Sequence, residues 1–236
     1  DLSKITITPD WVPVGDPPAA SPGMHRFLWD LRYTLPVELR SARNPRSAGV
    51  WAPPGRYSVR LTAAGQTRTQ PLVLRKDPRV KASEADLVQE FELAREVEKE
   101  RLRLASALRR AESLERELAG LRGRELKVAG AADAVEVFSR ELESVAGPVP
   151  VPGSEDFFEE SEVPRTLRRI SASLARLARS VESADAAPTP DAIAGARWRR
   201  EAGGEALNRW EELLRSDLPR LNGILQAAGI PPVATN

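Results

Sequence analysis

The residues that could carry chemistry in this chain are few. His25 is the single histidine, and the 236 residues contain no cysteine. An imidazole acts as a general base only with a nucleophile or a substrate group within reach, and the spacing around His25 suggests no such partner. The lack of cysteine excludes disulfides and thiolate metal sites. We therefore expect His25 to be a locally hydrogen-bonded side chain at the margin of a sheet, and we predict no catalytic residue.

Carboxylates crowd one segment of the chain, residues 155–162. Oxygen ligands at this density suit calcium, but the segment lacks the regular Asp, Asn and Gly spacing of a calcium loop. Negative charge also stabilises the start of a helix, and an apolar helical pattern begins at Leu167. We expect an acidic lead-in to that helix, with no metal ion and no cofactor. The carboxylates are Glu155, Asp156, Glu159, Glu160 and Glu162.

Tryptophans are the remaining candidates for ligand contact. Trp51 and Trp11 lie in loop-like segments, where exposed rings could contact a sugar. The other interpretation is that these rings anchor the packing between two domains. Both interpretations stay open, and both apply to Trp198 as well.

Arginines recur in stripes along the C-terminal half of the chain. Nucleic-acid binding needs a positive face with few acids nearby, whereas glutamates interleave with these arginines. Opposite charges three or four residues apart on a helix pair with each other. We therefore expect solvated helix faces and no nucleic-acid partner. The arginines are Arg168, Arg169, Arg176, Arg179, Arg197, Arg199 and Arg200.

Composition places the chain among ordinary globular proteins and divides it in two. Hydrophobic residues make up 41% and aromatic residues only 5%, which suits a region built on Leu, Ala and Val. The net charge is +1, but residues 1–80 hold 12 Lys and Arg against 6 Asp and Glu, while the remainder holds 23 against 28. This asymmetry either draws the two parts together or reflects two solvated surfaces. We also expect no membrane span, because a span needs about 18 consecutive apolar residues and none are present.

Alternating apolar and polar residues mark the first part of the chain as β structure. Residues 24–33 and 55–63 alternate with period two, and residues 67–75 return after a turn at 64–66. A lone hairpin is marginal in water, so we expect more strands to cover its apolar face. The predicted domain is a small Ig-like antiparallel β-sandwich over residues 1–80, with further strands upstream of Asp1. Its predicted core residues are Phe27, Trp29, Tyr57, Val59 and Leu61.

Apolar residues at helical spacing dominate the rest of the chain. Ser83, with Asp86 three residues later, predicts the start of a helix of about 38 residues, roughly 57 Å long. Further helices are predicted over about 128–145, from 167 to 181 with core residues Leu167, Ile170, Leu174 and Leu177, and from Pro190 onward. A break or kink is predicted at Pro219, followed by a short last helix. Short connections favour an up-down four-helix bundle over residues 81–236.

Two of these segments resemble a known protein family. GMHRFLWDLRY at 23–33 and WAPPGRYSVRLTAAGQTRTQPLVLRKDPRV at 51–80 are similar to the C-terminal region of large bacterial exported β-propeller proteins. These are the sortilin-like or BNR-repeat proteins, often labelled glycosyl hydrolases. Segments at 184–189 and 210–222 fit the same family. In addition, FxWD at 27–30 with PGxYxVxL at 54–61 resembles the Ig-like domain of flagellar hook-capping proteins, which favours the sandwich.

The resemblance implies a β-propeller ahead of the two modules, and it carries over no catalytic residue. We therefore expect a non-catalytic accessory or interaction region of a larger exported protein, periplasmic or extracellular. Its partners would be its own propeller domain and, further, a polysaccharide or another protein. The alternative is a carbohydrate-binding module that assists a glycoside hydrolase through Trp51. A third hypothesis is self-association through the long first helix.

Overall fold

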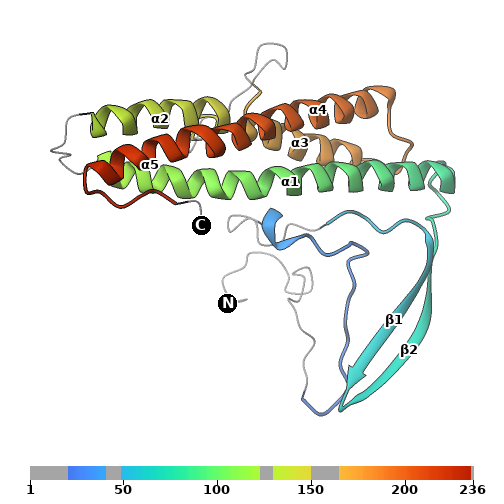
Figure 1. The fold of residues 1–236 in the computed structure, drawn as a ribbon. Helices are drawn as coiled ribbons and strands as arrows, with labels where there is room; N and C mark the ends of the chain where they lie inside the picture. The colour runs from blue at the N-terminus through green and yellow to red at the C-terminus, as the bar shows by residue number, and fades with distance from the viewer. Residues whose placement is uncertain (1–20, 41–48, 123–129, 150–164, 235–236) are drawn as a thin grey trace, which may run out of the picture.

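The computed structural model describes residues 21–40, 49–122, 130–149 and 165–234. In this part of the chain an elongated group of helices carries a single two-stranded antiparallel sheet that projects away from it (Figure 1). We call helices α1 to α5 the helical body and strands β1 and β2 the hairpin.

Helix α1, Glu84–Arg122, is the longest element and begins where the sequence predicts. The backbone N–H of Asp86 donates to Ser83 Oγ at 3.1 Å, and the N–H of Ser83 donates to a carboxylate oxygen of Asp86 at 2.8 Å. This reciprocal pair satisfies two amide groups that the first turn leaves without a helical partner. The buried apolar stripe of α1 continues to Leu121, along the whole helical body.

The other helices form two rods beside α1. Helices α2, Ala131–Ala146, and α3, Leu167–Val181, follow one another along α1 (Figure 1). Helix α4, Pro190–Glu212, continues through a π-helical turn, Leu213–Asp217, into α5, Leu218–Ala227. Helix α3 packs on α1 and α4, and α2 packs on α1 and α5. The expected up-down four-helix bundle is therefore wrong, because α2 and α3 share one rod and no break separates α4 from α5.

The absence of a break has a local cause. Pro219 stands in the first turn of α5, where a missing N–H costs little, but its ring would still crowd the carbonyl of Arg215 in the preceding turn. The wider π-helical turn relieves this contact while the chain stays helical from α4 into α5. Leu213 before the proline and Leu221 after it are both buried, so one apolar stripe runs through the junction.

The core of the body matches the predicted apolar positions. Leu167, Ile170, Leu174 and Leu177 are all buried, as expected. The most deeply buried large side chains come from every rod. They are Val97, Leu104, Leu114, Leu118, Val135, Leu142, Leu167, Leu174 and Leu225.

The hairpin consists of β1, Gly55–Ala63, and β2, Gln66–Leu74. Its register runs from Gly55 opposite Leu74 to Ala63 opposite Gln66. Ala64 and Gly65 close the turn with φ of 49° and 75°. Two positive φ values give the turn twist that matches paired strands, so the predicted hairpin is confirmed.

The expected sandwich is wrong, since residues 24–30 add no third strand to the hairpin. Leu31 has φ of 61°, which breaks the extended run, and Trp29 Nε1 donates to the Arg32 carbonyl at 2.9 Å. Side chains that bond nearby backbone groups compete with ladder pairing. The predicted sandwich core is consequently open, with Phe27, Val59 and Leu61 exposed by 62%, 54% and 63%.

A short pairing joins the N-terminal segment to the body instead. The Tyr33 N–H donates to the Val50 carbonyl at 2.9 Å, and Arg32 pairs with Trp51 in an isolated bridge. Val50 is buried in the helical core, and the Tyr33 ring lies 5.4 Å from that of Phe91 on α1. This pairing holds the base of the hairpin against the body.

Candidate functional site

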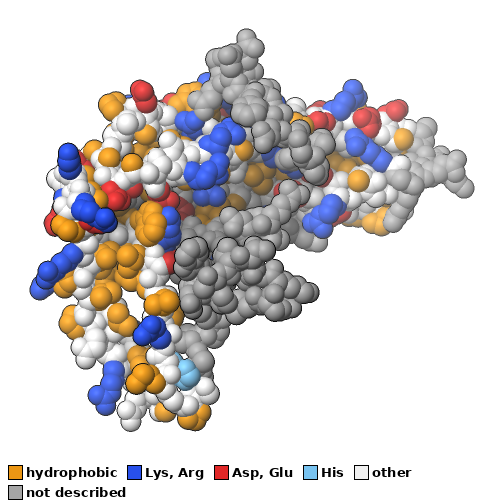
Figure 2. Space-filling model, turned by 180° about the vertical axis from the view of Figure 1, so that it is seen from behind, with side chains coloured by type: hydrophobic (Ala, Val, Ile, Leu, Met, Phe, Trp, Pro, Cys, Tyr) orange, Lys and Arg blue, Asp and Glu red, His pale blue; other side chains and the backbone are white. Residues whose placement is uncertain are grey.

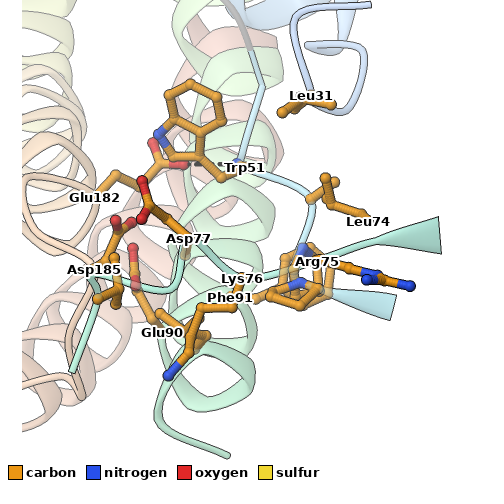
Figure 3. Close-up of a pocket in the computed structure, with 16 residues that line it drawn as sticks. Leu31, Trp51, Leu74, Arg75, Lys76, Asp77, Glu90, Phe91, Glu182 and Asp185 are labelled. Carbon is orange, nitrogen blue, oxygen red and sulfur yellow. Dashed lines mark hydrogen bonds between the residues drawn. The ribbon is translucent and has the colours of Figure 1, made fainter. Parts of the chain in front are cut away.

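A pocket of about 160 Å³ lies where the base of the hairpin meets the helical body (Figure 3). We call it the junction pocket. Apolar side chains from the loops and from α1 line part of it, and carboxylates line another part together with the basic side chains of Arg75 and Lys76. The apolar members include Leu31, Leu74, Leu87 and Phe91, and the acidic members are Asp77, Glu90, Glu182 and Asp185.

Glu182 connects the loops to the end of α3. Its carboxylate accepts the backbone N–H of Trp51 at 2.9 Å and lies 3.4 Å from a guanidinium nitrogen of Arg32. The same Arg32 stacks 3.7 Å above the centre of the Trp51 ring and donates to the Gly49 carbonyl at 2.8 Å. Because Arg32 and Glu182 are each largely withdrawn from water, this pair fixes the loop on the body more firmly than a surface pair does.

Glu90 is the most perturbed acid in the junction pocket. Its side chain is buried on α1, and burial raises its pKa to about 7, helped by the nearby charges of Asp185 and Glu182 and opposed by the N–H of Ala186. About two helical turns further along α1, burial also raises the pKa of Glu98. The positive charge of Arg95 acts in the opposite direction and lowers this pKa. A carboxylic acid that titrates near neutrality can exchange a proton under physiological conditions.

The sequence contains a signal for these two acids in the spacing of the apolar stripe of α1. Leu87, Ala94 and Val97 belong to the buried stripe of α1, and Glu90 and Glu98 fall three or four residues from them on the same face. An acid on an apolar stripe is either paired or shifted in pKa. Glu182 and Arg32, by contrast, are 150 residues apart in sequence, so only the fold brings them together.

The other chemical candidates lie elsewhere. His25 is exposed, and its Nε2 lies 2.6 Å from the Ser21 carbonyl oxygen, outside the pocket lining. The acidic segment 155–162 and Trp11 lie outside the described residues. Within the described part of the chain, no three carboxylate or histidine side chains are grouped closely enough to hold a metal ion.

The predicted ligand contact Trp51 borders the junction pocket and is 43% exposed. One face of its ring carries the Arg32 guanidinium, so only the remaining surface is free for a sugar. The Trp198 ring has guanidinium groups of Arg165 and Arg199 at 5.7 Å and 5.8 Å.

Two arginines of the predicted basic stripes are structural. Arg199 is buried on α4 and donates to Ser173 Oγ at 2.6 Å. Arg168 donates to both carboxylate oxygens of Glu115 at 2.9 Å and 2.5 Å, which ties α3 to α1. These side chains hold rods together and face carboxylates or hydroxyls.

None of the helices in the described part of the chain has the length and apolarity that crossing a membrane requires.

The hairpin offers a second candidate surface with the opposite charge. Residues opposite each other in register share a face, so Tyr57, Val59, Leu61, Leu72 and Leu74 lie on one face, which we call the apolar face and which also includes Gln70 and Arg68. Residues 55–76 contain five Lys and Arg and no Asp or Glu. Figure 2 shows orange and blue side chains over this projection. All side chains from 58 to 71 are exposed, so the body covers only the base.

The comparisons with known proteins identify no relative: no family model matches the chain, and no curated protein and no solved structure is similar to it.

Proposed function

We propose that this chain is a non-catalytic interaction region in which the helical body carries the hairpin as its contact surface. The observation behind the proposal is the exposure of the hairpin from residue 58 to residue 71. A two-stranded sheet is marginal by itself, and soluble proteins seldom leave apolar strand residues uncovered without a partner. Contact with another protein would bury these residues.

Contacts at the base of the hairpin support this role because they fix it to the rest of the molecule. Trp29 packs edge-on against Tyr57 at 5.6 Å, and the Arg32 and Glu182 pair anchors the adjoining loop to α3. A contact surface on a rigid support loses less conformational entropy on binding than one on a free loop.

The larger protein is the second part of the proposal. The family resemblance points to an exported protein whose β-propeller precedes this region, and that propeller is the first candidate partner. The sequence encoded upstream of Asp1 tests this directly. Propeller repeats and a secretion signal are expected there, and their absence would contradict both the propeller and the export.

Hydrogen–deuterium exchange tests the interaction role itself. We expect the amides of β1 and β2 to exchange more slowly in the longer natural protein than in this chain alone, while those of α1 exchange equally. Equal exchange of the hairpin in both proteins would show that nothing covers it, and the interaction role would then be wrong.

A carbohydrate-binding module is the second candidate function, and the exposure of Trp51 at the junction pocket favours it. Calorimetry with a panel of polysaccharides tests it. Heat of binding that disappears in Trp51→Ala, but not in Trp198→Ala, would support sugar contact. No heat with any polysaccharide would remove this candidate.

A further inference from the structure

We propose that the outer edge of β1 accepts an extended segment of a partner protein as an added strand, and that this segment alternates apolar and acidic residues. The proposal rests on the interaction role proposed above and specifies the edge, the binding mode and the partner's chemistry. Strand addition of this kind draws affinity from main-chain hydrogen bonds and specificity from alternate side chains.

The turn determines which backbone groups of β1 are free. Ala63 and Gln66 close a two-residue turn, and the pair at that position exchanges hydrogen bonds. Along an antiparallel ladder, such pairs alternate with pairs whose N–H and C=O groups point outward. Ser58 and Arg60 belong to the outward set. Among the described residues, none forms a backbone hydrogen bond with that edge.

The outer edge of β2 is less suitable because Pro71 lies on it. Pro71 is opposite Ser58, in a pair of the outward kind, so its missing N–H interrupts the outer row of donors. Proline at this position is a common protection of sheet edges against added strands. An incoming strand therefore finds a complete row of donors and acceptors on β1 and an incomplete row on β2.

The side chains along β1 indicate what the added strand carries. Val59 and Leu61 lie on the apolar face, and Arg56 and Arg60 lie on the other face. Within the described part of the chain, no carboxylate lies within ion-pair distance of either arginine. Opposite charges stabilise neighbouring strands when they face each other, and apolar pairs do the same on the other face. Alternating apolar and acidic residues satisfy both faces at once.

A second copy of this chain fits the edge poorly. Pairing β1 with another β1 would place arginines of both copies on the same face of the joint sheet. Like charges on neighbouring strands destabilise the pairing. The charge of the hairpin thus selects an acidic partner over self-association.

Nuclear magnetic resonance of the isotope-labelled chain tests the proposal with a synthetic peptide that alternates valine and glutamate over the length of β1. We expect its addition to shift the amide signals of Ser58 and Arg60 and to slow their hydrogen exchange. Two control peptides are used, one that alternates valine and lysine and one with the same valines and glutamates in two blocks. Neither control is expected to protect these amides.

Two variants separate edge pairing from simple charge attraction. Ser58→Pro removes one outward N–H without touching the bonds between β1 and β2, and we expect at least a tenfold loss of peptide affinity. The double variant Arg56→Glu with Arg60→Glu should reverse the preference in favour of the valine and lysine peptide. Arg68→Glu on β2 is the control, and we expect it to lower the affinity for the valine and glutamate peptide less than the double variant does.

The outcomes distinguish this proposal from the interaction role. Strand addition at β1 would be overturned if the control peptide with its valines and glutamates in two blocks bound as tightly as the alternating peptide. It would also be overturned if Ser58→Pro left the affinity for the alternating peptide unchanged. Shifts confined to residues 24–30, or no shift at all, would overturn it too. If the hairpin is nevertheless protected in the longer protein, the interaction role stands and only the edge is wrong. If the hairpin is unprotected there, the interaction role itself fails.

Discussion

Gly147 ends α2 in a position that only glycine can occupy. Its φ is 91°, and a Cβ built on it would lie 2.5 Å from the hydroxyl oxygen of Thr166. Arg168 donates to the Gly147 carbonyl and also donates to the carboxylate of Glu115 on α1. One residue thus sets how closely α2 and α3 approach each other on α1.

Gly147→Ala is expected to lower the free energy of unfolding by about 2 kcal/mol or more, from the positive φ and the clash together. Thermal and chemical unfolding measure the effect. Thr166→Val is the matched control, because the buried Thr166 hydroxyl has no hydrogen-bond partner among the residues that the structure describes. Removing it should be neutral or slightly stabilising. Equal destabilisation by both substitutions would contradict this account of the joint.

Glu90 predicts a dependence of stability on pH. Its pKa is about 7 in the folded protein against 4.5 for a free side chain, so the folded state binds the proton more tightly. Its favourable contribution is complete below about pH 4.5 and is lost as the pH rises through 7. Asp185, Glu182 and the N–H of Ala186 are the groups that act on it.

Glu90→Gln should therefore unfold at a higher temperature than the natural protein at pH 8, and at nearly the same temperature at pH 4. Melting curves across this range measure the difference. The exposed Glu92 on the same helix provides a control, and Glu92→Gln should show no such divergence. A stabilisation that does not change with pH would refute the role of the charge.

The hairpin turn contains a residue that is poorly suited to it. Ala64 adopts φ of 49°, a left-handed conformation that costs an alanine about 1 kcal/mol and an asparagine less. Ala64→Asn should therefore slow hydrogen exchange of the Leu61 and Arg68 amides several-fold, since this pair is of the hydrogen-bonded kind. Gly65→Ala should accelerate it. The idea fails if the two substitutions act in the same direction.

At the scale of elements, the hairpin and the helical body differ in what stabilises them. Every helix buries an apolar stripe against another rod, and burial of each Leu or Ile contributes about 1.5–3 kcal/mol. The hairpin has two strands, and its contacts with the rest of the molecule lie at its base, where Tyr57 packs on Trp29 and Leu74 lines the junction pocket. Local turn geometry and cross-strand pairs are all that maintain its outer part.

Removing the outer part of the hairpin should leave the body unchanged. Replacing residues 58–71 with Asn-Gly keeps Tyr57 opposite Leu72, which is again a pair of the hydrogen-bonded kind. We expect the melting temperature to stay within about 2 °C of the natural value, since these residues are all exposed. A large drop would show that the hairpin supports the fold and is not mainly a contact surface.

At the scale of the whole molecule, the question is whether the N-terminal part folds independently. The expected boundary near residue 80 stays a prediction. Val50 belongs to the helical core, and Glu182 binds the loop that precedes the hairpin. Both observations favour one cooperative unit.

Leu174→Asp tests this, because Leu174 is almost fully buried between rods and a carboxylate there costs several kcal/mol. We expect the helices and the hairpin to unfold together, monitored by circular dichroism and by the hairpin amide signals. Ala172→Asp, exposed on the same helix, should change little. A hairpin that persists while the helices are lost would support two independent domains.

The helices could be predicted from the sequence because their causes are local. Ser83 and Asp86 form the predicted cap, and Thr189 accepts the N–H of Ala192 at the start of α4. The stripes of α1 and α3 appear at the expected residues for the same reason. The hairpin was predictable too, from period-two alternation on both sides of a tight turn.

Only the tertiary structure decided how these elements assemble, because assembly depends on contacts between distant residues. Whether α2 and α3 share one rod depends on what each meets along α1. Whether residues 24–30 become a strand depends on the bend at Leu31 and on the competing bonds around Trp29. The meeting of Arg32 with Glu182 across 150 residues has no sequence pattern at all. Periodicity specifies which face of an element is apolar, whereas the partner of that face is selected by the packing of the whole chain.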